Sequence, residues 1–287
     1  MPVRPTTSPA GAAPPLLPVG RRPPLGDYVR QLWDRRHFIY ADSRARAFSG
    51  NRDMLLGNLW LIGVPILSGI MYYIIFALIL KVNRGIPNFT GFLLIGIFLF
   101  QFTTSCLNQG VTSMARGRGL TTAFSFPRAA IPLSGLVRET LSMAPVLATL
   151  ALLVLVVPPG TSITWTWLLF PAVFALQTIF NGGLMLYAAR LGSAIPDFKH
   201  VVSFLSRFWF YTSGVFFSVE RFVNDPYWLA IVMLNPMFLV LDMSRDLLLY
   251  DTVPDGRSWL MLSIWALSAA ALGFWYFWQG EETYGQH

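Results

Sequence analysis

Charge is scarce in this sequence of 287 residues. Lys and Arg together number 21 and Asp and Glu number 14, so that 12% of the residues are charged, about half the roughly 25% usual in soluble domains. Each of four charge-free stretches is longer than the roughly 20 apolar residues that cross a hydrocarbon core of about 30 Å. They are residues 54–80, 85–115, 140–189 and 258–280. The scarcity excludes a soluble enzyme and predicts an all-α polytopic membrane protein.

Residues that bind metal ions or form disulfides are also few. Cys106 is the only cysteine, which excludes an intrachain disulfide and a cysteine metal site. The three histidines, His37, His200 and His287, have no metal-ligand spacing. We therefore expect no metal ion and no cofactor on this chain.

The charge-free stretches and one further apolar run divide into six predicted transmembrane helices. Pro158, Pro159 and Gly160 form a turn signal that splits the longest stretch into two. The predicted spans cover residues 55–80, 89–107, 135–157, 165–189, 201–219 and 258–278. Residues 110–128, between the second and third spans, are predicted to be a polar loop.

A seventh apolar segment, residues 227–250, does not fit a simple crossing. Asn235 and Pro236 interrupt it, and the 14 residues after them would rise about 21 Å as a helix, less than the membrane core. We expect two short re-entrant or interfacial helices; a seventh span is the alternative. Asp242, Arg245 and Asp246 share one face of the second helix and are expected to form a surface pair.

Both ends of the chain are predicted to be cytoplasmic. Residues 1–26 hold eight of the twenty prolines and are expected to form a disordered tail. Residues 27–53 alternate arginines with apolar residues, as in an amphipathic helix on the membrane surface. With the N-terminus inside, 15 Lys and Arg lie on the cytoplasmic side and five outside. After the membrane domain, residues 54–280, a short tail of residues 281–287 ends inside. This bias explains the net charge of +7 without nucleic acid as a partner.

The sequence has no motif that would supply energy for transport. The phosphate-binding pattern G-x-x-x-x-G-K-[ST] is absent, because neither Lys81 nor Lys199 follows a glycine. The first, second, fourth and sixth predicted spans also hold no carboxylate for a proton relay. If the chain moves a substrate uphill, the energy comes from another chain.

Three short motifs carry a resemblance to a known family. They are Gly57-Asn58-Leu59-Trp60 with Pro65, Phe126-Pro127-Arg128 with Ile131-Pro132, and Leu234-Asn235-Pro236. Their order resembles that in the permease subunits of ABC-2 type exporters, over residues 27–280. Within that family the chain is similar to the Wzm-like exporters of O-antigen, teichoic acid and cell-wall galactan, and most like the mycobacterial-type galactan exporter permease.

The resemblance implies a transport subunit and not an enzyme. It implies a homodimer in the bacterial inner membrane, assembled with two copies of a separate ATPase subunit that binds ATP and Mg²⁺. The implied substrate is a polyprenyl-pyrophosphate-linked polysaccharide.

Aromatic side chains are the candidates for the substrate channel, because they offer flat apolar surfaces to sugar rings. The candidates are Phe98, Phe102, Phe208, Trp209, Tyr211 and Phe216. The alternative is that these residues face lipid or form an aromatic belt. Arg207 is a candidate for the pyrophosphate of the lipid carrier; its alternative is a side chain that extends to the cytoplasmic interface.

Two further sets of residues have predicted roles. The predicted ATPase contact consists of Arg116, Arg118, Phe126, Pro127 and Arg128, where prolines constrain a basic segment. An ordinary basic loop is the alternative. Asn235 and Pro236 are the predicted outer gate, or else part of a passive packing element.

Three other functions remain open at this stage. The first is a membrane-embedded enzyme acting on polyprenyl-phosphate-linked glycan, for which Asp242 and Asp246 would be the acidic pair. The second is an ABC-2 exporter of another lipid or small molecule. The third is a passive channel or scaffold. Co-purification of an ATPase that responds to lipid-linked glycan would separate the proposed exporter from these.

Overall fold

The computed structural model describes residues 23–49, 59–79, 86, 88–117, 127–157, 161–217, 225, 232–282 and 284. Over these ranges the regular structure is helical and contains no strand, which confirms the all-α fold class. The predicted tails, apart from residues 23–26, 281, 282 and 284, lie outside the described residues. So does most of the first predicted re-entrant helix.

Four of the described helices are long and apolar enough to cross a membrane. They are α4 (Phe89–Arg116), α6 (Ala130–Val156), α7 (Phe170–Ala194) with the preceding 3₁₀ turn η3 (Trp165–Leu169), and α12 (Gly256–Gln279). They agree with the second, third, fourth and sixth predicted spans.

The other two predicted spans correspond to shorter helices. The first contains α3 (Trp60–Tyr73), which continues as the π-helix η2 (Ile74–Ile79). The fifth contains α8 (Phe198–Thr212), an α-helix of 15 residues. Six spans therefore stay a prediction.

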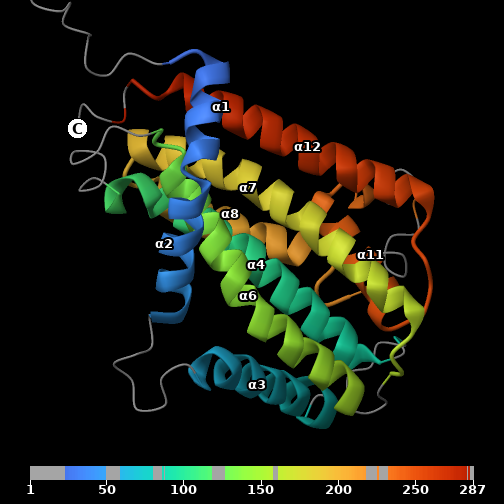
Figure 1. The fold of residues 1–287 in the computed structure, drawn as a ribbon. Helices are drawn as coiled ribbons and strands as arrows, with labels where there is room; N and C mark the ends of the chain where they lie inside the picture. The colour runs from blue at the N-terminus through green and yellow to red at the C-terminus, as the bar shows by residue number, and fades with distance from the viewer. Residues whose placement is uncertain are drawn as a thin grey trace, which may run out of the picture.

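The long helices lie side by side in a bundle with α4 near its centre (Figure 1). Neighbouring helices pack in the order α12, α7, α4, α6 and α3, each against the next. Helix α8 and α11 (Pro236–Leu248) also pack against α4 and α7. In the most apolar 18-residue stretch of α4, 78% of residues are buried, against 22% in α12. Helix α4 thus forms the core, while most of the surface of α12 is exposed in the single chain.

Glycines allow α7 and α12 to approach closely. A Cβ added to Gly183 would lie 2.2 Å from the carbonyl carbon of Ala269, and one added to Gly273 would lie 2.4 Å from the carbonyl oxygen of Gly183. Only hydrogen fits at either position. Backbone contact of this kind is how helices associate in lipid, where burial from water gives no driving force.

The prediction of a polar loop from residue 110 is wrong over residues 110–116, because α4 continues to Arg116. The glycine at its start has a packing role: a Cβ on Gly110 would lie 2.6 Å from the carbonyl oxygen of Met185. A glycine that permits close approach to α7 looks, in sequence, like one that ends a helix.

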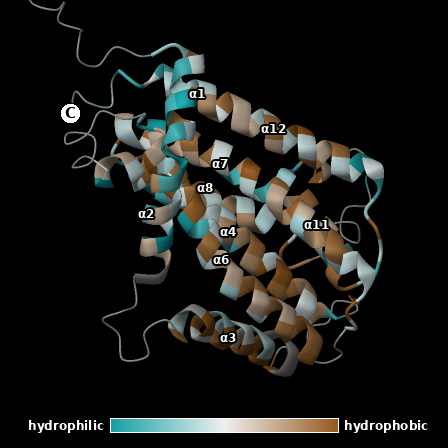
Figure 2. Cartoon of the chain, in the orientation of Figure 1, coloured by the Kyte–Doolittle hydropathy of each residue, from teal (hydrophilic) through white to brown (hydrophobic). Residues whose placement is uncertain are grey.

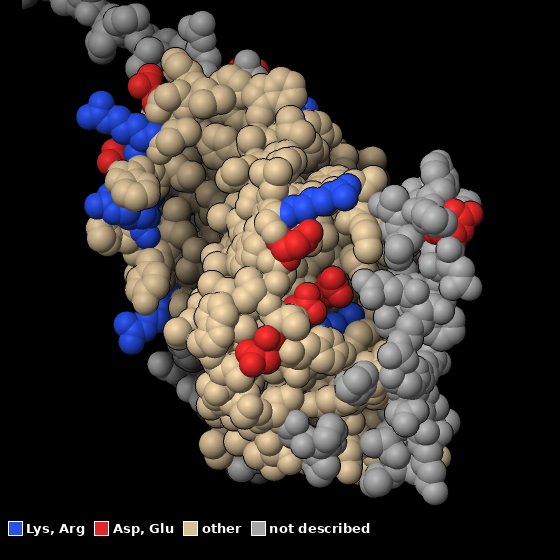
Figure 3. Space-filling view, turned by 90° about the vertical axis from the view of Figure 1, so that its right-hand side faces the viewer, with Lys and Arg blue, Asp and Glu red and all other residues tan. Residues whose placement is uncertain are grey.

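The predicted surface helix is two helices, α1 (Leu25–Asp34) and α2 (Arg36–Ser49), which meet at Arg35. Helix α2 packs on α6, and both helices lie across one end of the bundle (Figure 1). Hydrophilic residues concentrate on α1 and α2, whereas the bundle helices are largely hydrophobic (Figure 2). Most of the surface in Figure 3 is uncharged; Lys and Arg lie along its left edge, and others lie beside a group of Asp and Glu near the middle.

Candidate functional site

The described ends of the chain meet in a buried polar cluster at one end of the bundle. The hydroxyl of Tyr28 in α1 donates a 2.7 Å hydrogen bond to Oε2 of Glu281. The same hydroxyl accepts a 3.0 Å hydrogen bond from the backbone N–H of Ala129. Oε1 of Glu281 accepts one of 2.9 Å from the backbone N–H of Arg128. These four residues, the terminal cluster, join α1 to the start of α6 and the end of α12.

Burial controls the ionisation of the terminal cluster. Desolvation raises the pKa of the Glu281 carboxyl, and hydrogen bonds from Arg128 and Tyr28 oppose that shift. Desolvation and the nearby Glu281 carboxylate raise the pKa of the Tyr28 hydroxyl, which therefore remains a donor. No local sequence signal predicts this pairing across 253 residues. The one hint is that Glu281 is the first charge after the last apolar stretch.

Three of the five predicted ATPase-contact residues are described. Arg128 belongs to the terminal cluster, and Pro127 beside it is buried. Arg116 ends α4, donates a 2.9 Å hydrogen bond to Oε1 of Gln109, and lines a separate cavity. Arg118 and Phe126 lie outside the described residues. Pro127 and Arg128 are thus held beside α1, and the ATPase contact itself stays a prediction.

The predicted channel residues of α8 fall into two groups. Phe208 and Tyr211 are 63% and 62% exposed, on the same face as the exposed Phe204. Arg207 is exposed beside them. Trp209 points into the bundle, where its ring meets Phe100 edge-on at a centroid distance of 5.7 Å. Helix α8 therefore presents an aromatic face with one cation on the surface of the single chain.

The remaining predicted channel residues lie elsewhere. Phe98 and Phe102 of α4 are each 3% exposed, and both border a space of about 790 Å³, open side included, between α3, α4 and α6. Phe216 follows α8 and stacks on Tyr211 at 6.0 Å. In the single chain the six aromatics do not line one common cavity, and their channel role stays a prediction.

The predicted gate residues form the start of α11. Asn235 caps this helix by accepting a 3.0 Å hydrogen bond from the backbone N–H of Met237, and Pro236 occupies the first turn. The Asn235 side chain also accepts a 2.9 Å hydrogen bond from Nε1 of Trp209 and donates one of 3.1 Å to Oγ of Ser213. Asn235 thus ties α11 to the end of α8, and gating by this pair stays a prediction.

The expected surface position of Arg245 is wrong. Arg245 is 3% exposed, and its guanidinium donates to the backbone carbonyls of Phe92, Gly214 and Val215. Its Cζ also lies 3.3 Å from the centroid of the Phe92 ring. The helical spacing places Arg245 on the same face of α11 as Asp242 and Asp246. The Arg245 side chain, however, packs against Phe92 of α4. The arginine anchors α11 to the core.

No metal-binding group is present within the ranges that the structure describes: nowhere there do three His, Cys, Asp or Glu side chains gather closely enough to hold a metal ion. The binding of ATP and Mg²⁺ by a partner chain stays a prediction.

The sequence is similar to that of known membrane transport proteins. Residues 45–249 match the model of the ABC-2 type transporter family. The O-antigen export system permease protein RfbA of Myxococcus xanthus is 26% identical over 84% of this chain and 94% of its own length. A protein of the same description from Klebsiella pneumoniae is 27% identical over 70% of this chain and 76% of that protein. The polysialic acid transport protein KpsM of Escherichia coli is 26% identical over 76% of this chain and 83% of its own length. The helical membrane bundle and the match over most of its length place this chain in the ABC-2 type transporter family.

Proposed function

We propose that this chain is the permease subunit of a polysaccharide exporter in the bacterial inner membrane, driven by a separate ATPase. The observation that carries the proposal is the aromatic face of α8, with Phe204, Phe208 and Tyr211 exposed beside Arg207. Relatives named for the export of O-antigen and polysialic acid support a glycan as the substrate. The polyprenyl-pyrophosphate link and the identity of the glycan as galactan are the finer parts of the proposal.

The aromatic face suits a glycan path between two copies of the chain. Rigid aromatic rings bind sugar faces without fixing one hydrogen-bond pattern, so successive sugars can slide past. An exposed apolar surface of a membrane protein contacts either lipid or another chain. At the α8 face the exposed Arg207 favours a second chain, because a charge that faces lipid is costly. In a homodimer, the α8 helices of the two protomers would border a shared path.

The proposed ATPase contact is formed by α1, α2 and the segment that leads into α6. Arg30 and Arg44 are exposed on α1 and α2, at the end of the bundle where the terminal cluster lies. A movement imposed on α1 would pass through Tyr28 to Ala129 and to Glu281. The cluster therefore gives an ATPase a rigid connection to α6 and α12.

Alanine substitution of the aromatic face tests the channel. The double variant Phe208→Ala and Tyr211→Ala should lower the export rate several-fold in proteoliposomes that contain the partner ATPase, while the amount of folded protein is unchanged. Trp275→Ala, which removes an exposed aromatic from α12, is the matched control. Export at the normal rate by the double variant would contradict the channel assignment.

Charge reversal tests the ATPase contact separately. Arg30→Glu with Arg44→Glu should reduce the amount of ATPase that co-purifies with the permease, because both side chains are exposed and lie outside the membrane core. A full complement of ATPase on this variant would show that the contact lies elsewhere.

A further inference from the structure

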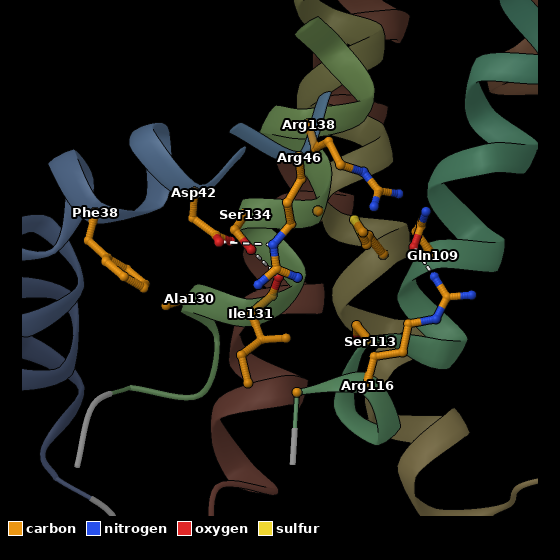
Figure 4. A pocket seen from close by; sticks show the side chains of 13 residues that line it. Phe38, Asp42, Arg46, Gln109, Ser113, Arg116, Ala130, Ile131, Ser134 and Arg138 are labelled. Carbon is orange, nitrogen blue, oxygen red and sulfur yellow. Dashed lines mark hydrogen bonds and ion pairs between the residues drawn. The ribbon is translucent and has the colours of Figure 1, made fainter. Parts of the chain in front are cut away.

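Three arginines from three different helices gather around one cavity (Figure 4). Arg46 of α2, Arg116 of α4 and Arg138 of α6 all line a space of about 620 Å³, open side included. The cavity lies at the end of the bundle that α2 crosses. The sequence assigned Arg116 to the ATPase contact and gave Arg46 and Arg138 no ligand.

The cavity has a surplus of positive charge. Among the described residues that line it, Asp42 is the only carboxylate, and Oδ1 of Asp42 lies 2.9 Å from Nε of Arg46. Arg138 is also paired, with Glu139 at 2.7 Å, but Glu139 is not among the residues that line this cavity. With Glu139 counted, three guanidinium groups face two carboxylates, and the remaining positive charge favours the binding of an anion.

Polar neighbours hold the arginines in place. Oε1 of Gln109 accepts the hydrogen bond from Arg116, and Nε2 of Gln109 donates one of 3.2 Å to Oε1 of Glu139. Oε1 of Glu139 in turn accepts a 2.7 Å hydrogen bond from the guanidinium of Arg138. One chain of hydrogen bonds thus fixes Arg116 and Arg138 relative to each other across α4 and α6. Guanidinium groups held in place in this way suit a phosphate, because one guanidinium can donate two parallel hydrogen bonds to two phosphate oxygens.

A second cavity follows the first along the same two helices. It is lined by α3, α4 and α6, with Glu139 at the near end and Ser142, Gln101 and Ser105 further along. The second cavity lies about one helical turn further along both helices, since Ser105 precedes Gln109 by four residues and Ser142 follows Arg138 by four. The arrangement fits a ligand with a charged head and a body that extends into the membrane.

We propose that Arg46, Arg116 and Arg138 form a binding site for the phosphate-bearing head group of a lipid. The site differs from Arg207, which lies exposed on α8. Within the proposed function, on which this identification of the ligand rests, the site receives the pyrophosphate of the lipid-linked substrate before the glycan moves. The Arg46 and Asp42 pair lies within α2 and is separate from the hydrogen bonds that link α4 and α6.

Binding measurements on the permease–ATPase complex test the site. The probes are polyprenyl pyrophosphate, phosphatidylglycerol and inorganic pyrophosphate, each titrated against the purified complex with native mass spectrometry as readout. Arg46→Gln or Arg116→Gln should each weaken lipid binding about tenfold, the scale of one lost hydrogen bond to a charged group. Arg138→Lys, which keeps the charge beside Glu139, should also weaken it, because lysine cannot bind in a fork.

A control distinguishes the site from other basic surfaces. Arg257→Gln removes an exposed arginine near the start of α12, outside the cavity. It should not change lipid affinity. Binding of either lipid that depends on the three arginines supports the proposal. The lipid that binds more tightly, polyprenyl pyrophosphate or phosphatidylglycerol, identifies which head group the site takes.

Three results would overturn the proposal: equal lipid affinity in all variants, binding of inorganic pyrophosphate alone, or loss of the ATPase with lipid affinity unchanged. The last would make the arginines a protein contact. Lost lipid binding with normal export would overturn this site and leave the proposed function intact. Normal lipid binding without ATP-driven export would overturn the proposed function and leave this site intact.

Discussion

The hydroxyl of Tyr28 and the carboxylate of Glu281 are joined by a buried 2.7 Å hydrogen bond across 253 residues of sequence. The bond fixes the first described helix to the segment after the last one. Both described ends therefore lie at the same end of the bundle. That both termini lie on the cytoplasmic side of the membrane stays a prediction.

Removal of the Tyr28 hydroxyl should destabilise the protein. Tyr28→Phe leaves the N–H of Ala129 and one oxygen of Glu281 without their partner, at a cost of about 1–3 kcal/mol in the free energy of unfolding. Thermal unfolding in detergent measures the effect. Tyr40→Phe is the control, because Tyr40 is exposed on α2. Equal melting temperatures for the two variants would contradict the role given to the cluster.

The terminal cluster should make stability depend on pH. Burial raises the pKa of Glu281 above its unfolded value of 4.5, so the folded protein binds this proton more tightly than the unfolded chain does. Its contribution to stability is fully present below about pH 4.5 and is lost as pH rises through the higher folded value. Melting temperatures measured from about pH 5 to pH 8 should fall with pH.

Glu281→Gln should flatten that pH dependence, because glutamine does not titrate. Other carboxyl groups are common to both proteins, so the difference between the two curves isolates Glu281. A pH profile that is the same in the variant would show that another group is responsible.

The contact between α7 and α12 should not tolerate a side chain. Gly183→Val would place its Cβ 2.2 Å from the backbone of Ala269, and the two helices would have to separate. We expect most of the variant to be lost as aggregate in size-exclusion chromatography. Gly256→Ala is the matched control, since nothing lies within 4 Å of the added Cβ. Monodisperse Gly183→Val protein in normal yield would contradict the packing.

Loss of the Asn235 side chain should loosen the junction between α8 and α11. Asn235→Ala removes the helix cap and the hydrogen bonds to Trp209 and Ser213, and should cost about 1–3 kcal/mol of stability. Asn235→Asp keeps both acceptor roles and should cost less. Thermal unfolding gives the order; an alanine variant as stable as the aspartate variant would argue against the junction.

The long helices could be predicted because apolar runs of more than 20 residues have few alternatives in a folded protein. The end of α4 could not, because the polar residues from Gly110 onward read as a loop until Gly110 is seen packed against Met185 of α7. Arg245 was placed at the surface because helical spacing shows which residues share a face and not what covers that face. Burial of an arginine depends on carbonyl groups of distant segments, here Phe92 and Gly214.

The candidate sites were predictable to different degrees. A run of aromatics marked α8 in the sequence, but only the fold separates the exposed Phe208 and Tyr211 from the inward Trp209. The terminal cluster and the arginine cavity each combine residues from three segments. Single arginines such as Arg46 and Arg138 carry no local pattern that would join them.

Transport in a defined system tests whether this chain exports lipid-linked polysaccharide. Proteoliposomes that contain this chain and its partner ATPase would be given labelled polyprenyl-pyrophosphate-linked polysaccharide on the ATPase side. We expect the intact polysaccharide to become protected inside the vesicles with ATP, and not with a non-hydrolysable ATP analogue. Chemical modification of the lipid-linked glycan without transfer, or equal transfer with and without ATP hydrolysis, would contradict it.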